Sequence, residues 1–530
     1  MKHLDDKPLH EILRLHAKQN PDKTAIIWYG AAITYGELDS LSDKCAAWLS
    51  TLGVCKGEPV ALFMQNCPQY VIAHFGIQKL GAIASPCSPL FKQHELNYQL
   101  QDQGARVILA ADALYPIVKQ SLDDTLIEHI GLVHYADCLP STPSYSVPEE
   151  ILVPRTIPND TLDLMAELNR LSTKAPLVAT SMDDVALLVY TSGTTGRPKG
   201  AMLTYANALF KTAGGVETGG IKPHDIHLVI PPLYHISGML CGINIPIYLG
   251  ATAVLHYRFS PVATLESITC HKPTYWKGIA PMLQALMDCP DAGQYDLSSL
   301  RLCPATSFGI RTTPELAARW AAFTGGAQAY EAGYGLTETH TFDSVMPPEA
   351  VRWGTNGRLL PGAECRIINA VTNKEVDCAG SGEVFLKSPG NFRGYWKQPE
   401  KTAETLLDSW VRTGDIGTVD ADGYLTLLGR SKEMIKVSGY SVFPEDVEAI
   451  LLRHPDLAQA AVIGVSDPSK GEVVKAILVA RTNNGPALTS DELVRWCKEN
   501  MSAYKVPRIV EFRDNLPMTA SGKVQRHLLQ

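Results

Sequence analysis

A run of ten residues, Thr191 to Gly200, constrains this chain more than any other segment. It contains four hydroxyl groups, three glycines and two cations, and it directly follows the apolar run 185–190. Glycines let backbone amides face a ligand, while hydroxyls and cations bind phosphate oxygens. The pattern predicts a strand that leads into a phosphate-binding loop, with an ordinary polar surface loop as the alternative.

The spacing of this loop differs from that of the Walker motif, which places four residues between its glycine and a Gly-Lys-Ser/Thr ending. Here Lys199 follows Pro198 and precedes Gly200 and Ala201, so the hydroxyl that would bind magnesium is missing. A phosphate loop of another kind is therefore expected.

Size and charge restrict the classes of protein that fit. At 530 residues the chain is too long for one core, so about three folding units are expected. The formal net charge of -8 argues against nucleic-acid or anionic-membrane binding. Twelve cysteines, scattered singly from Cys45 to Cys497, are typical of reduced thiols in a cytoplasm. Because the segment Met1 to Lys23 is too charged for a secretory signal, we expect a cytoplasmic protein.

The segment Ile236 to Leu255 has no charged residue over twenty positions, which is the length of a membrane span. It also contains Asn244, Pro246 and several glycines. These residues favour a buried helix, a turn and a buried strand, so no transmembrane segment is predicted.

The first half of the chain alternates strand and helix signals. Pro59–Met64 reads as a buried strand, and Asn66 is predicted to cap a helix that has Pro68 in its first turn. This helix is expected to run to about Leu80, with Gly81 as its left-handed stop. The alternation predicts a layered α/β architecture with much parallel sheet, in which ligands bind at the carboxyl ends of strands.

Three further features are expected along this half. Residues 139–181 contain several prolines and little periodicity, and they are predicted to form a loosely structured connection. Thr204 is expected to cap a helix through Ala213. Further strands are expected at 106–110, 229–230 and 253–255.

The pattern changes to strands and tight turns between about 380 and 430. Trp410–Thr413 is strand-like and leads into Gly414-Asp415, so Asp415 is expected just after a strand. Asp422-Gly423 predicts a hairpin turn. Further on, Pro444 marks a helix start, strands are expected at 460–465 and 473–480, and Thr489 with Glu492 forms a capping box. Roughly the last hundred residues are therefore predicted to form a compact α+β unit with its own core.

Five motifs in this order resemble those of the adenylate-forming superfamily, which includes acyl-CoA synthetases, nonribosomal peptide adenylation domains and firefly-type luciferases. They are the phosphate loop, Tyr334-Gly335-Leu336-Thr337-Glu338, Arg412-Thr413-Gly414-Asp415, Gly429-Arg430-Ser431-Lys432 and Ser521-Gly522-Lys523. The resemblance extends from Thr34 to Lys523. It implies a large N-terminal domain with layered sheets and several subdomains, residues 1–432. A small mobile α+β C-terminal domain, residues 433–530, is implied behind it.

The resemblance also implies a reaction in two halves. A carboxylate attacks the α-phosphate of ATP, pyrophosphate leaves, and an acyl-adenylate remains. A thiol then attacks the acyl carbon and releases AMP.

Roles for individual residues follow from the resemblance. Tyr334 is expected against adenine, Thr337 at the α-phosphate and Glu338 on Mg²⁺, which prefers carboxylate oxygen. Asp415 is expected on the ribose hydroxyls, and Arg430 on ribose or phosphate. The residues implied to bind the ATP phosphates are Thr191, Ser192, Gly193, Thr194, Thr195, Gly196 and Lys199.

Lys523, near the end of the chain, would otherwise be read as a solvated residue. The resemblance brings it into the active site, between the attacking carboxylate and the α-phosphate, where an ammonium stabilises accumulating negative charge. The pivot of the small domain is implied at Lys432. After rotation, the residues implied at the active site are Lys436, Ser438, Gly439 and Tyr440, with Ser438-Gly439 under the pantetheine arm of coenzyme A.

The acid pocket is expected around His235, where amino-acid-activating relatives carry an aspartate. A buried substrate ammonium without that counter-ion would be costly, so amino acids are disfavoured. His235 either gates the acyl tunnel or is a packing histidine. Small residues at 332 and 333 favour a longer acid. The pocket residues implied are Tyr234, His235, Met239, Ala305, Ala332 and Gly333.

Two charged residues near this pocket have open interpretations. Trp276 and Lys277 are candidates for shaping the pocket. For Lys277, a position at the surface is the alternative. Glu331 either forms part of the pocket floor or points into solvent.

The function expected is that of an ATP-dependent carboxylic acid–CoA ligase for a medium- or long-chain fatty acid or an aryl acid. Alternatives are an acyl-adenylate ligase that loads a free-standing acyl carrier protein and a non-catalytic adenylate-binding protein. A luciferase-like oxygenase uses the same scaffold, but nothing in the sequence marks that activity. ATP, Mg²⁺ and coenzyme A are the expected ligands, and no nucleic acid is expected. Whether the chain forms a homodimer is left open by the sequence.

Overall fold

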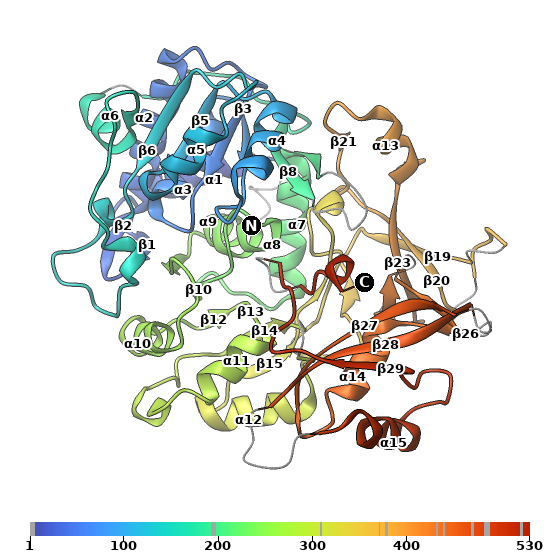
Figure 1. Ribbon diagram of the computed structural model, residues 1–530. Coiled ribbons are helices and arrows are strands. Elements are labelled where there is room, and N and C mark those ends of the chain that lie inside the picture. The colour runs from blue at the N-terminus through green and yellow to red at the C-terminus, as the bar shows by residue number, and fades with distance from the viewer. Residues whose placement is uncertain are drawn as a thin grey trace.

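Two eight-stranded sheets covered by helices make up most of the molecule, and three smaller sheets follow along the chain (Figure 1). The computed structural model describes residues 6–172, 174–191, 198–307, 310–369, 372–376, 380–430, 433–437, 440–467, 471–481, 488–519 and 523–529. This is the predicted mixed α/β architecture, with a large N-terminal domain and a smaller C-terminal one.

The first large sheet contains the strand that leads into the predicted phosphate loop. Its strand order is β21-β9-β8-β4-β3-β5-β6-β7, and the pairs from β4 to β7 are parallel. Strands β3 and β5 are buried along their whole length, as the near-continuous apolar runs of parallel sheets usually are. The strands are β3 (Pro59–Phe63), β4 (Ile83–Pro86), β5 (Val107–Ala111), β6 (His129–Val133), β7 (Leu162–Asp163), β8 (Val185–Thr191), β9 (Lys199–Thr204) and β21 (Gly394–Tyr395).

The second large sheet has the order β13-β14-β12-β10-β11-β1-β2, with β15 paired to β14. Its pairs are parallel except for the β1–β2 hairpin. The carboxyl ends of its parallel strands face the region where the site residues gather. The strands are β1 (Thr24–Trp28), β2 (Ala31–Thr34), β10 (Ile226–Val229), β11 (Thr252–Leu255), β12 (Tyr275–Trp276), β13 (Gly278–Ile279), β14 (Leu302–Thr306) and β15 (Gln328–Glu331).

Helices connect and cover these sheets. The largest core cluster joins residues of both sheets with those of α1, α2, α3 and α7. The helices are α1 (Leu9–Gln19), α2 (Tyr35–Thr51), α3 (Pro68–Lys79), α4 (Gln93–Gln103), α5 (Tyr115–Gln120), α6 (Leu164–Arg170), α7 (Tyr205–Thr218), α8 (Ile236–Met239), α9 (Ile245–Leu249), α10 (Pro261–His271), α11 (Ala280–Met287), α12 (Pro314–Thr324) and α13 (Pro399–Thr405).

Several predicted helix ends are confirmed and one is wrong. Gly81 has a positive φ of 70° after α3, and the Thr204 side chain accepts a bond from the backbone of Asn207 at the start of α7. The N-cap of α3, however, is Cys67 rather than Asn66. The Asn66 amide is used elsewhere, because it donates to three carbonyl oxygens of the second sheet's loops.

The uncharged segment 236–255 forms α8, a π-helical turn at Leu240–Asn244, α9 and β11, which agrees with the predicted helix, turn and strand. Among the helices of the described residues, none is both long and apolar enough to cross a lipid bilayer. The predicted loose connection at 139–181 is mostly irregular, but it contributes β7 to the first sheet and also forms α6. The prolines of this segment led to the prediction of irregular structure, so the short strand and helix were missed.

Two smaller sheets carry the central motifs. One has the order β16-β17-β18, and the other is β19-β20-β23-β22 with β24 paired to β23. Asp415 lies inside the continuous strand β23 rather than after a strand, because Gly414 has a positive φ and the chain continues extended. The predicted Asp422-Gly423 hairpin joins β23 to β24. The strands are β16 (Gly333–Tyr334), β17 (Ser344–Val345), β18 (Arg358–Leu359), β19 (Glu364–Ile368), β20 (Gly382–Lys387), β22 (Leu406–Leu407), β23 (Trp410–Val419) and β24 (Leu425–Arg430).

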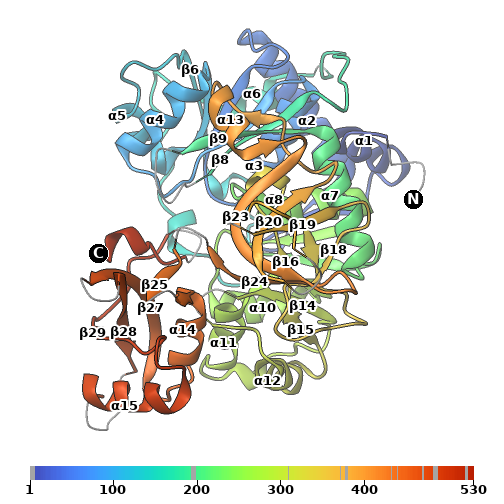
Figure 2. The same cartoon turned by 90° about the vertical axis from the view of Figure 1, so that its right-hand side faces the viewer.

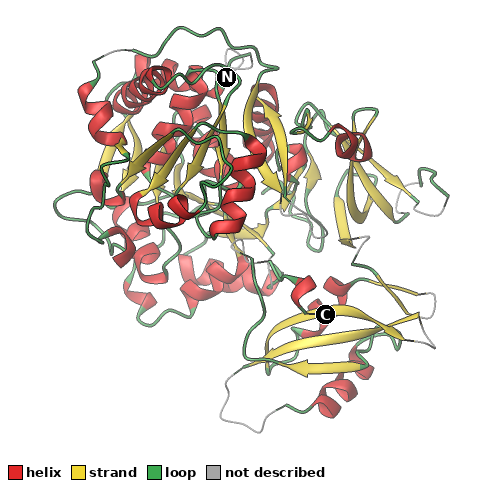
Figure 3. Ribbon diagram, turned by 45° about the horizontal axis from the view of Figure 1, so that its top comes forward, coloured by secondary structure: helices red, strands yellow, loops and turns green. Residues whose placement is uncertain are grey.

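The last part of the chain forms its own sheet and core beside the large sheets (Figure 2; Figure 3). The predicted helix start at Pro444 and the Thr489–Glu492 capping box are both present. The sheet order is β26-β25-β28-β27, with β29 paired to β28. The elements are β25 (Ile435–Val437), β26 (Tyr440–Val442), α14 (Pro444–Leu451), β27 (Leu457–Asp467), β28 (Gly471–Ala480), α15 (Ser490–Asn500) and β29 (Ile509–Phe512).

Candidate active site

Asp415 joins two of the predicted motifs. It pairs in register with Arg430 across β23 and β24, and the Arg430 Nε lies 2.9 Å from Asp415 Oδ1. The Tyr334 hydroxyl, at the end of β16, donates to Asp415 Oδ2. Asp415 is 5% exposed, and among the described residues each of its oxygens has one partner. Because a carboxylate can accept about four hydrogen bonds, it keeps acceptor capacity for the hydroxyls of a ligand.

Tyr334 is fixed by this contact. Burial raises the pKa of its phenol well above the usual value, and the charge of Asp415 raises it further. Tyr334 therefore remains a neutral donor at every physiological pH.

Glu338 is held by a residue that the sequence did not single out. The Tyr395 hydroxyl donates to Glu338 Oε1 at 2.7 Å, and the Phe392 amide donates to the backbone oxygen of Glu338. The Lys199 ammonium lies 4.1 Å from the centre of the same tyrosine ring. Tyr395 thus connects the end of the predicted phosphate loop to the predicted metal ligand, because β21 pairs with β9.

The predicted phosphate loop connects β8 to β9. Thr191 and Lys199 are cross-strand partners at its base. The remaining predicted loop residues, Ser192, Gly193, Thr194, Thr195 and Gly196, lie outside the described residues.

A buried ion pair supports the turn that carries Thr337 and Glu338. Lys211 Nζ, on α7, lies 2.6 Å from Asp343 Oδ1, and the side chains are 0% and 1% exposed. The Thr339 hydroxyl donates to the other oxygen of Asp343, whose backbone amide donates to the Tyr334 oxygen. The pair therefore ties α7 to both ends of the 334–343 turn.

Lys523 reaches the same region from the far end of the chain. Desolvation by the surrounding protein lowers the pKa of its ammonium, and the charge of Arg430 lowers it further. The carboxylates of Asp415, Glu433 and Glu338 act on it in the opposite direction. The residue is nevertheless exposed, so it lies at the open side of the site. We call Tyr334, Glu338, Asp415, Arg430 and Lys523 the motif cluster.

The tail that carries Lys523 is anchored a few residues further on. Arg526 donates to Glu433 at 2.5 Å and to Glu448 at 2.9 Å, and it lies 3.3 Å from Glu445. Burial raises the pKa of the Glu445 carboxyl to about 7, against the opposing charge of Arg526. These bonds tie the tail to α14 and to the segment that follows β24.

His235 lies at the start of α8, where its Nδ1 accepts a hydrogen bond from the Ser237 amide at 3.3 Å. Burial lowers the pKa of its imidazole to about 4, and the charges of Lys523 and Lys277 lower it further. The ring is therefore neutral at pH 7. Both lysines therefore lie close enough to His235 to act on it electrostatically.

Asn66 explains how the loop before His235 is held. Its Nδ2 donates to the oxygens of Ile230, Pro231 and His256, and its Oδ1 accepts from the Leu233 amide at 2.7 Å. The sequence suggested only a helix cap for this residue. Its contacts are long-range, so no local pattern could have revealed them.

The residues implied for the second half-reaction are not part of the motif cluster. Two lie on strands of the C-terminal unit, and three lie outside the described part of the chain. Lys436 lies on β25 and Tyr440 on β26. Lys432, Ser438 and Gly439 lie outside the described residues.

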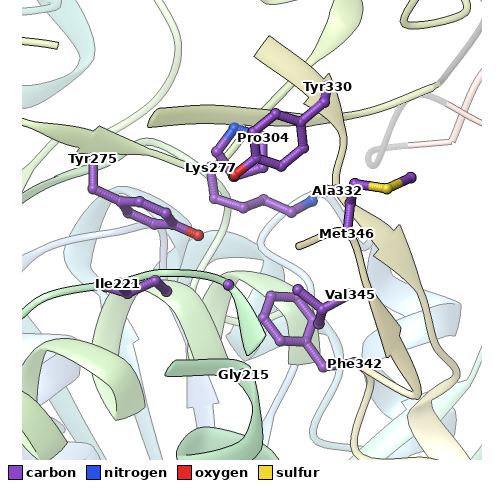
Figure 4. A pocket seen from close by; sticks show the side chains of 11 residues that line it. Gly215, Ile221, Tyr275, Lys277, Pro304, Tyr330, Ala332, Phe342, Val345 and Met346 are labelled. Carbon is purple, nitrogen blue, oxygen red and sulfur yellow. The ribbon is translucent and has the colours of Figure 1, made fainter. Parts of the chain in front are cut away.

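A small cavity of about 10 Å³ is lined by residues of the segment Ala332 to Met346 together with residues of β12, β14, β15 and α7 (Figure 4). Of the predicted pocket residues, Ala332 lines it, whereas Tyr234, His235, Met239, Ala305 and Gly333 do not. Most of its lining comes from residues that the sequence did not select. The lining residues are Gly215, Gly219, Ile221, Tyr275, Lys277, Pro304, Tyr330, Ala332, Phe342, Val345 and Met346.

Gly333 has a different reason to be small. Its φ is 141°, and a Cβ there would lie 2.2 Å from the backbone oxygen of Ser344. The close pairing of β16 and β17 therefore requires a glycine at this position, whatever the size of the substrate.

The two charged residues with open interpretations both turn inward. Lys277 is 8% exposed, which rules out the surface alternative, and its Nζ donates to the Thr306 hydroxyl at 2.5 Å. Glu331 accepts from both the hydroxyl and the amide of Ser307, so it does not simply point into solvent. Burial raises the pKa of Glu331 and lowers that of Lys277.

Comparison with protein families gives a match over most of the chain. The model described as "AMP-binding enzyme" matches residues 13–396, and the model described as "AMP-binding enzyme C-terminal domain" matches residues 446–523.

Individual relatives cover nearly the whole chain. A long-chain-fatty-acid–CoA ligase of Bacillus subtilis (strain 168) is 34% identical, over 99% of this chain and 94% of its own length. A feruloyl-CoA synthase of Amycolatopsis sp is 33% identical, over 96% of this chain and 95% of its own. The crystal structure of the anthranilate CoA ligase AuaEII with anthranoyl-AMP is 30% identical, with a TM-score of 0.87 over 99% of this chain and 97% of that one.

Proposed function

This chain belongs to the AMP-binding enzyme family, and we propose that it activates a carboxylic acid with ATP and transfers the acyl group to coenzyme A. In the first half, a carboxylate oxygen bonds to the α-phosphorus while the bond to pyrophosphate breaks. In the second half, the thiol sulfur bonds to the acyl carbon while the bond to AMP breaks, and the thiol proton is lost. The products are acyl-CoA, AMP and pyrophosphate.

For the nucleotide, we propose that the phosphates bind the loop 191–199, that the adenine lies against Tyr334 and that Thr337 donates to the α-phosphate. The ribose hydroxyls bind Asp415, whose two oxygens are oriented by Tyr334 and Arg430. A carboxylate held on both oxygens loses little freedom when a ligand binds, which favours binding.

Glu338 fits a magnesium ion. Tyr395 orients Oε1, whereas Oε2 has no hydrogen-bond partner among the described residues, and hard cations prefer such carboxylate oxygens. Bound with ATP, the ion would neutralise phosphate charge. Lys523 would stabilise the negative charge shared by the attacking carboxylate and the α-phosphate.

For the second half-reaction, we propose a boundary between residues 432 and 433, with Lys432 as the hinge. Rotation of the C-terminal unit would replace Lys523 by the β25–β26 segment, so that Lys436, Ser438, Gly439 and Tyr440 meet the coenzyme A arm. The support for this rotation is that Lys436 and Tyr440 lie on the paired strands β25 and β26, whereas Lys523 lies on the tail, so one unit presents the two sets of residues from different segments.

The acid is proposed to be a fatty or aryl acid rather than an amino acid. His235 is neutral, and no carboxylate lies within 4.0 Å of it among the described residues, so a substrate ammonium would have no counter-ion there. The imidazole can still donate or accept a hydrogen bond at the reacting carboxyl group.

The observation that carries this proposal is that Asp415 is bonded to both Tyr334 and Arg430, and that Lys523 lies close enough to Arg430, Asp415 and Glu338 to act on them electrostatically. The test is pyrophosphate release over a panel of carboxylic acids, followed by mass spectrometry of products with coenzyme A or an acyl carrier protein. We expect acid-dependent pyrophosphate and an acyl-CoA product. If only the carrier protein acquired a thioester, the acceptor would be the carrier and not coenzyme A. If no acid gave pyrophosphate, the proposal would be contradicted.

A further inference from the structure

The cavity shown in Figure 4 has three polar groups in a largely apolar wall. Ile221, Phe342, Val345 and Met346 supply apolar side chains. Tyr275, Tyr330 and Lys277 supply two hydroxyls and an ammonium. In Figure 4 the Lys277 side chain extends across the cavity toward Ala332.

These polar groups have few partners within the protein. Tyr275 and Tyr330 are 4% and 2% exposed, and neither hydroxyl has a hydrogen-bond partner among the residues described. The Lys277 ammonium has one, the Thr306 hydroxyl. An ammonium carries three N–H bonds, so Lys277 keeps donors for another group.

The other two buried lysines show what is missing at Lys277. Lys79 lies 2.5 Å from Asp39 and 2.7 Å from Asp43, and Lys211 lies 2.6 Å from Asp343. Within the described part of the chain, no carboxylate oxygen lies within 4.0 Å of Lys277 Nζ. Burying a cation without a counter-ion is costly, so a bound ligand that supplies an oxygen acceptor would stabilise this ammonium.

The nearest charged neighbours do not satisfy Lys277. Glu331 acts on it electrostatically, but among the described residues neither oxygen of that carboxylate lies within 4.0 Å of the ammonium, and both accept from Ser307. Cys241 is also close, but burial raises the pKa of its thiol to about 11, so it carries no charge at pH 7. The remaining donor capacity of Lys277 is therefore directed at the contents of the cavity.

We propose that Lys277, with the hydroxyls of Tyr275 and Tyr330, recognises an oxygen acceptor at the far end of the substrate acid, above all a second carboxylate. This inference rests on the proposed function, because it assumes that the reacting carboxyl group lies near His235 and Lys523. Lys277 borders the same hollow as Pro231 and Cys241, which lie on either side of His235 in the chain. The charge of Lys277 also acts on His235, so the cavity and the reacting centre are neighbours. A site built to bond a polar substrate group discriminates strongly against an analogue that lacks it.

The test compares matched acids of equal chain length: alkanoic acids, ω-hydroxy acids and α,ω-dicarboxylic acids, together with an aryl acid with and without a ring hydroxyl. We measure kcat/KM for pyrophosphate release with the unaltered enzyme, Lys277→Met and Lys277→Arg. The unaltered enzyme should prefer acids with a distal acceptor. Lys277→Met should lose about tenfold to one hundredfold for dicarboxylic acids and little for alkanoic acids, whereas Lys277→Arg should retain part of the preference.

Met346→Leu is the matched control, because it alters the same wall without a polar group; it should change all acids by similar factors. An equal loss for every acid in Lys277→Met, or no preference in the unaltered enzyme, would overturn the assignment. The preference of the unaltered enzyme needs no variant, so the test survives if Lys277→Met fails to fold. No pyrophosphate with any acid would instead contradict the proposed function itself, so the two failures are distinguishable.

Discussion

The motif cluster and the Lys277 cavity share the chain segment from Ala332 to Met346, but they treat buried charge differently. Around the motif cluster, buried charges are paired within the protein, as in Asp415 with Arg430 and Lys211 with Asp343. In the cavity, the ammonium of Lys277 has a hydroxyl as its partner and no carboxylate among the described residues.

This difference separates the groups proposed to bind the nucleotide, which is the same in every reaction, from the groups proposed to bind the acid, which varies. Every reaction of the family uses the same nucleotide, so groups that bind it can be oriented in advance by permanent partners. The acid varies, and a cavity that leaves donors unpaired depends on the ligand to satisfy them. Paired charges around the motif cluster therefore fit a role in the common chemistry. The ammonium in the cavity, without a carboxylate partner among the described residues, fits a role in selecting the acid.

The largest expected effect comes from breaking a pair. Lys211→Met leaves the buried Asp343 carboxylate without its partner and should lower the free energy of unfolding by about 3–5 kcal/mol. Urea denaturation measures this. The matched control is Lys277→Met, which removes a buried cation without isolating a carboxylate and should cost much less. Equal losses in the two variants would remove the distinction between the regions.

The next effect concerns the cation that the tail brings to the motif cluster. Lys523→Ala should slow acyl-adenylate formation by about 10²–10³-fold, the usual loss for one such donor. Thioester formation from supplied acyl-adenylate should largely survive. Lys505→Ala, whose ammonium lies 3.4 Å from Asp446 in the same unit, is the control and should change neither rate much. If both half-reactions slowed equally in Lys523→Ala, this role would be wrong.

A smaller effect tests the permanent orientation of Glu338. Tyr395→Phe removes the hydroxyl that donates to Glu338 Oε1 and should raise the magnesium concentration needed for half-maximal pyrophosphate release about tenfold. Tyr424→Phe is a suitable control, because its hydroxyl donates to Ala350, which belongs to neither region. An unchanged magnesium requirement in Tyr395→Phe would mean that Glu338 needs no such support.

The smallest effect is a pH dependence of the tail anchor. The folded-state pKa of Glu445 is raised to about 7 by burial, so the folded protein retains a proton there that the unfolded chain loses above about pH 4.5. Stability from this group is therefore present at low pH and decreases as the pH rises to about 7, by at most about 1.4 kcal/mol per pH unit.

Glu445→Gln should flatten that dependence. The groups that face Glu445 are Arg526, Glu448 and Glu433, and all of them remain in the variant. Melting temperatures between pH 5 and 8 provide the measurement. Parallel curves for the two proteins would contradict the assignment.

Local signals in the sequence predicted local structure well. Gly81, the Asp422-Gly423 turn and the Thr489–Glu492 capping box each depend on residues a few positions apart, and the structure contains all three. Asn66 was misplaced for the opposite reason, because its bonds to the loop before His235 link distant parts of the chain. Asp415 was misplaced because Gly414 takes a positive φ without ending the strand.

Several residues of the predicted motifs lie close together in the structure, but the motifs did not indicate what holds them. Tyr395 meets Glu338 only because β21 pairs with β9, and Lys277 enters the cavity because the chain turns between β12 and β13. A single lysine in an apolar run carries no local sign of burial, since its partner Thr306 lies on another strand. Such residues are found only after the sheets have been assembled.

The anchor at Arg526 has a consequence for how motion in this protein can be observed. Arg526 is bonded to Glu433 and Glu448, and Leu529 is fully buried, so the tail cannot withdraw Lys523 while the rest of its unit stays in place. In the proposed rotation, departure of that lysine and reorientation of the whole unit would be one event. A pair of spectroscopic labels, one at exposed Lys18 and one at exposed Glu499, would then report by their separation which of the two proposed orientations each molecule has adopted.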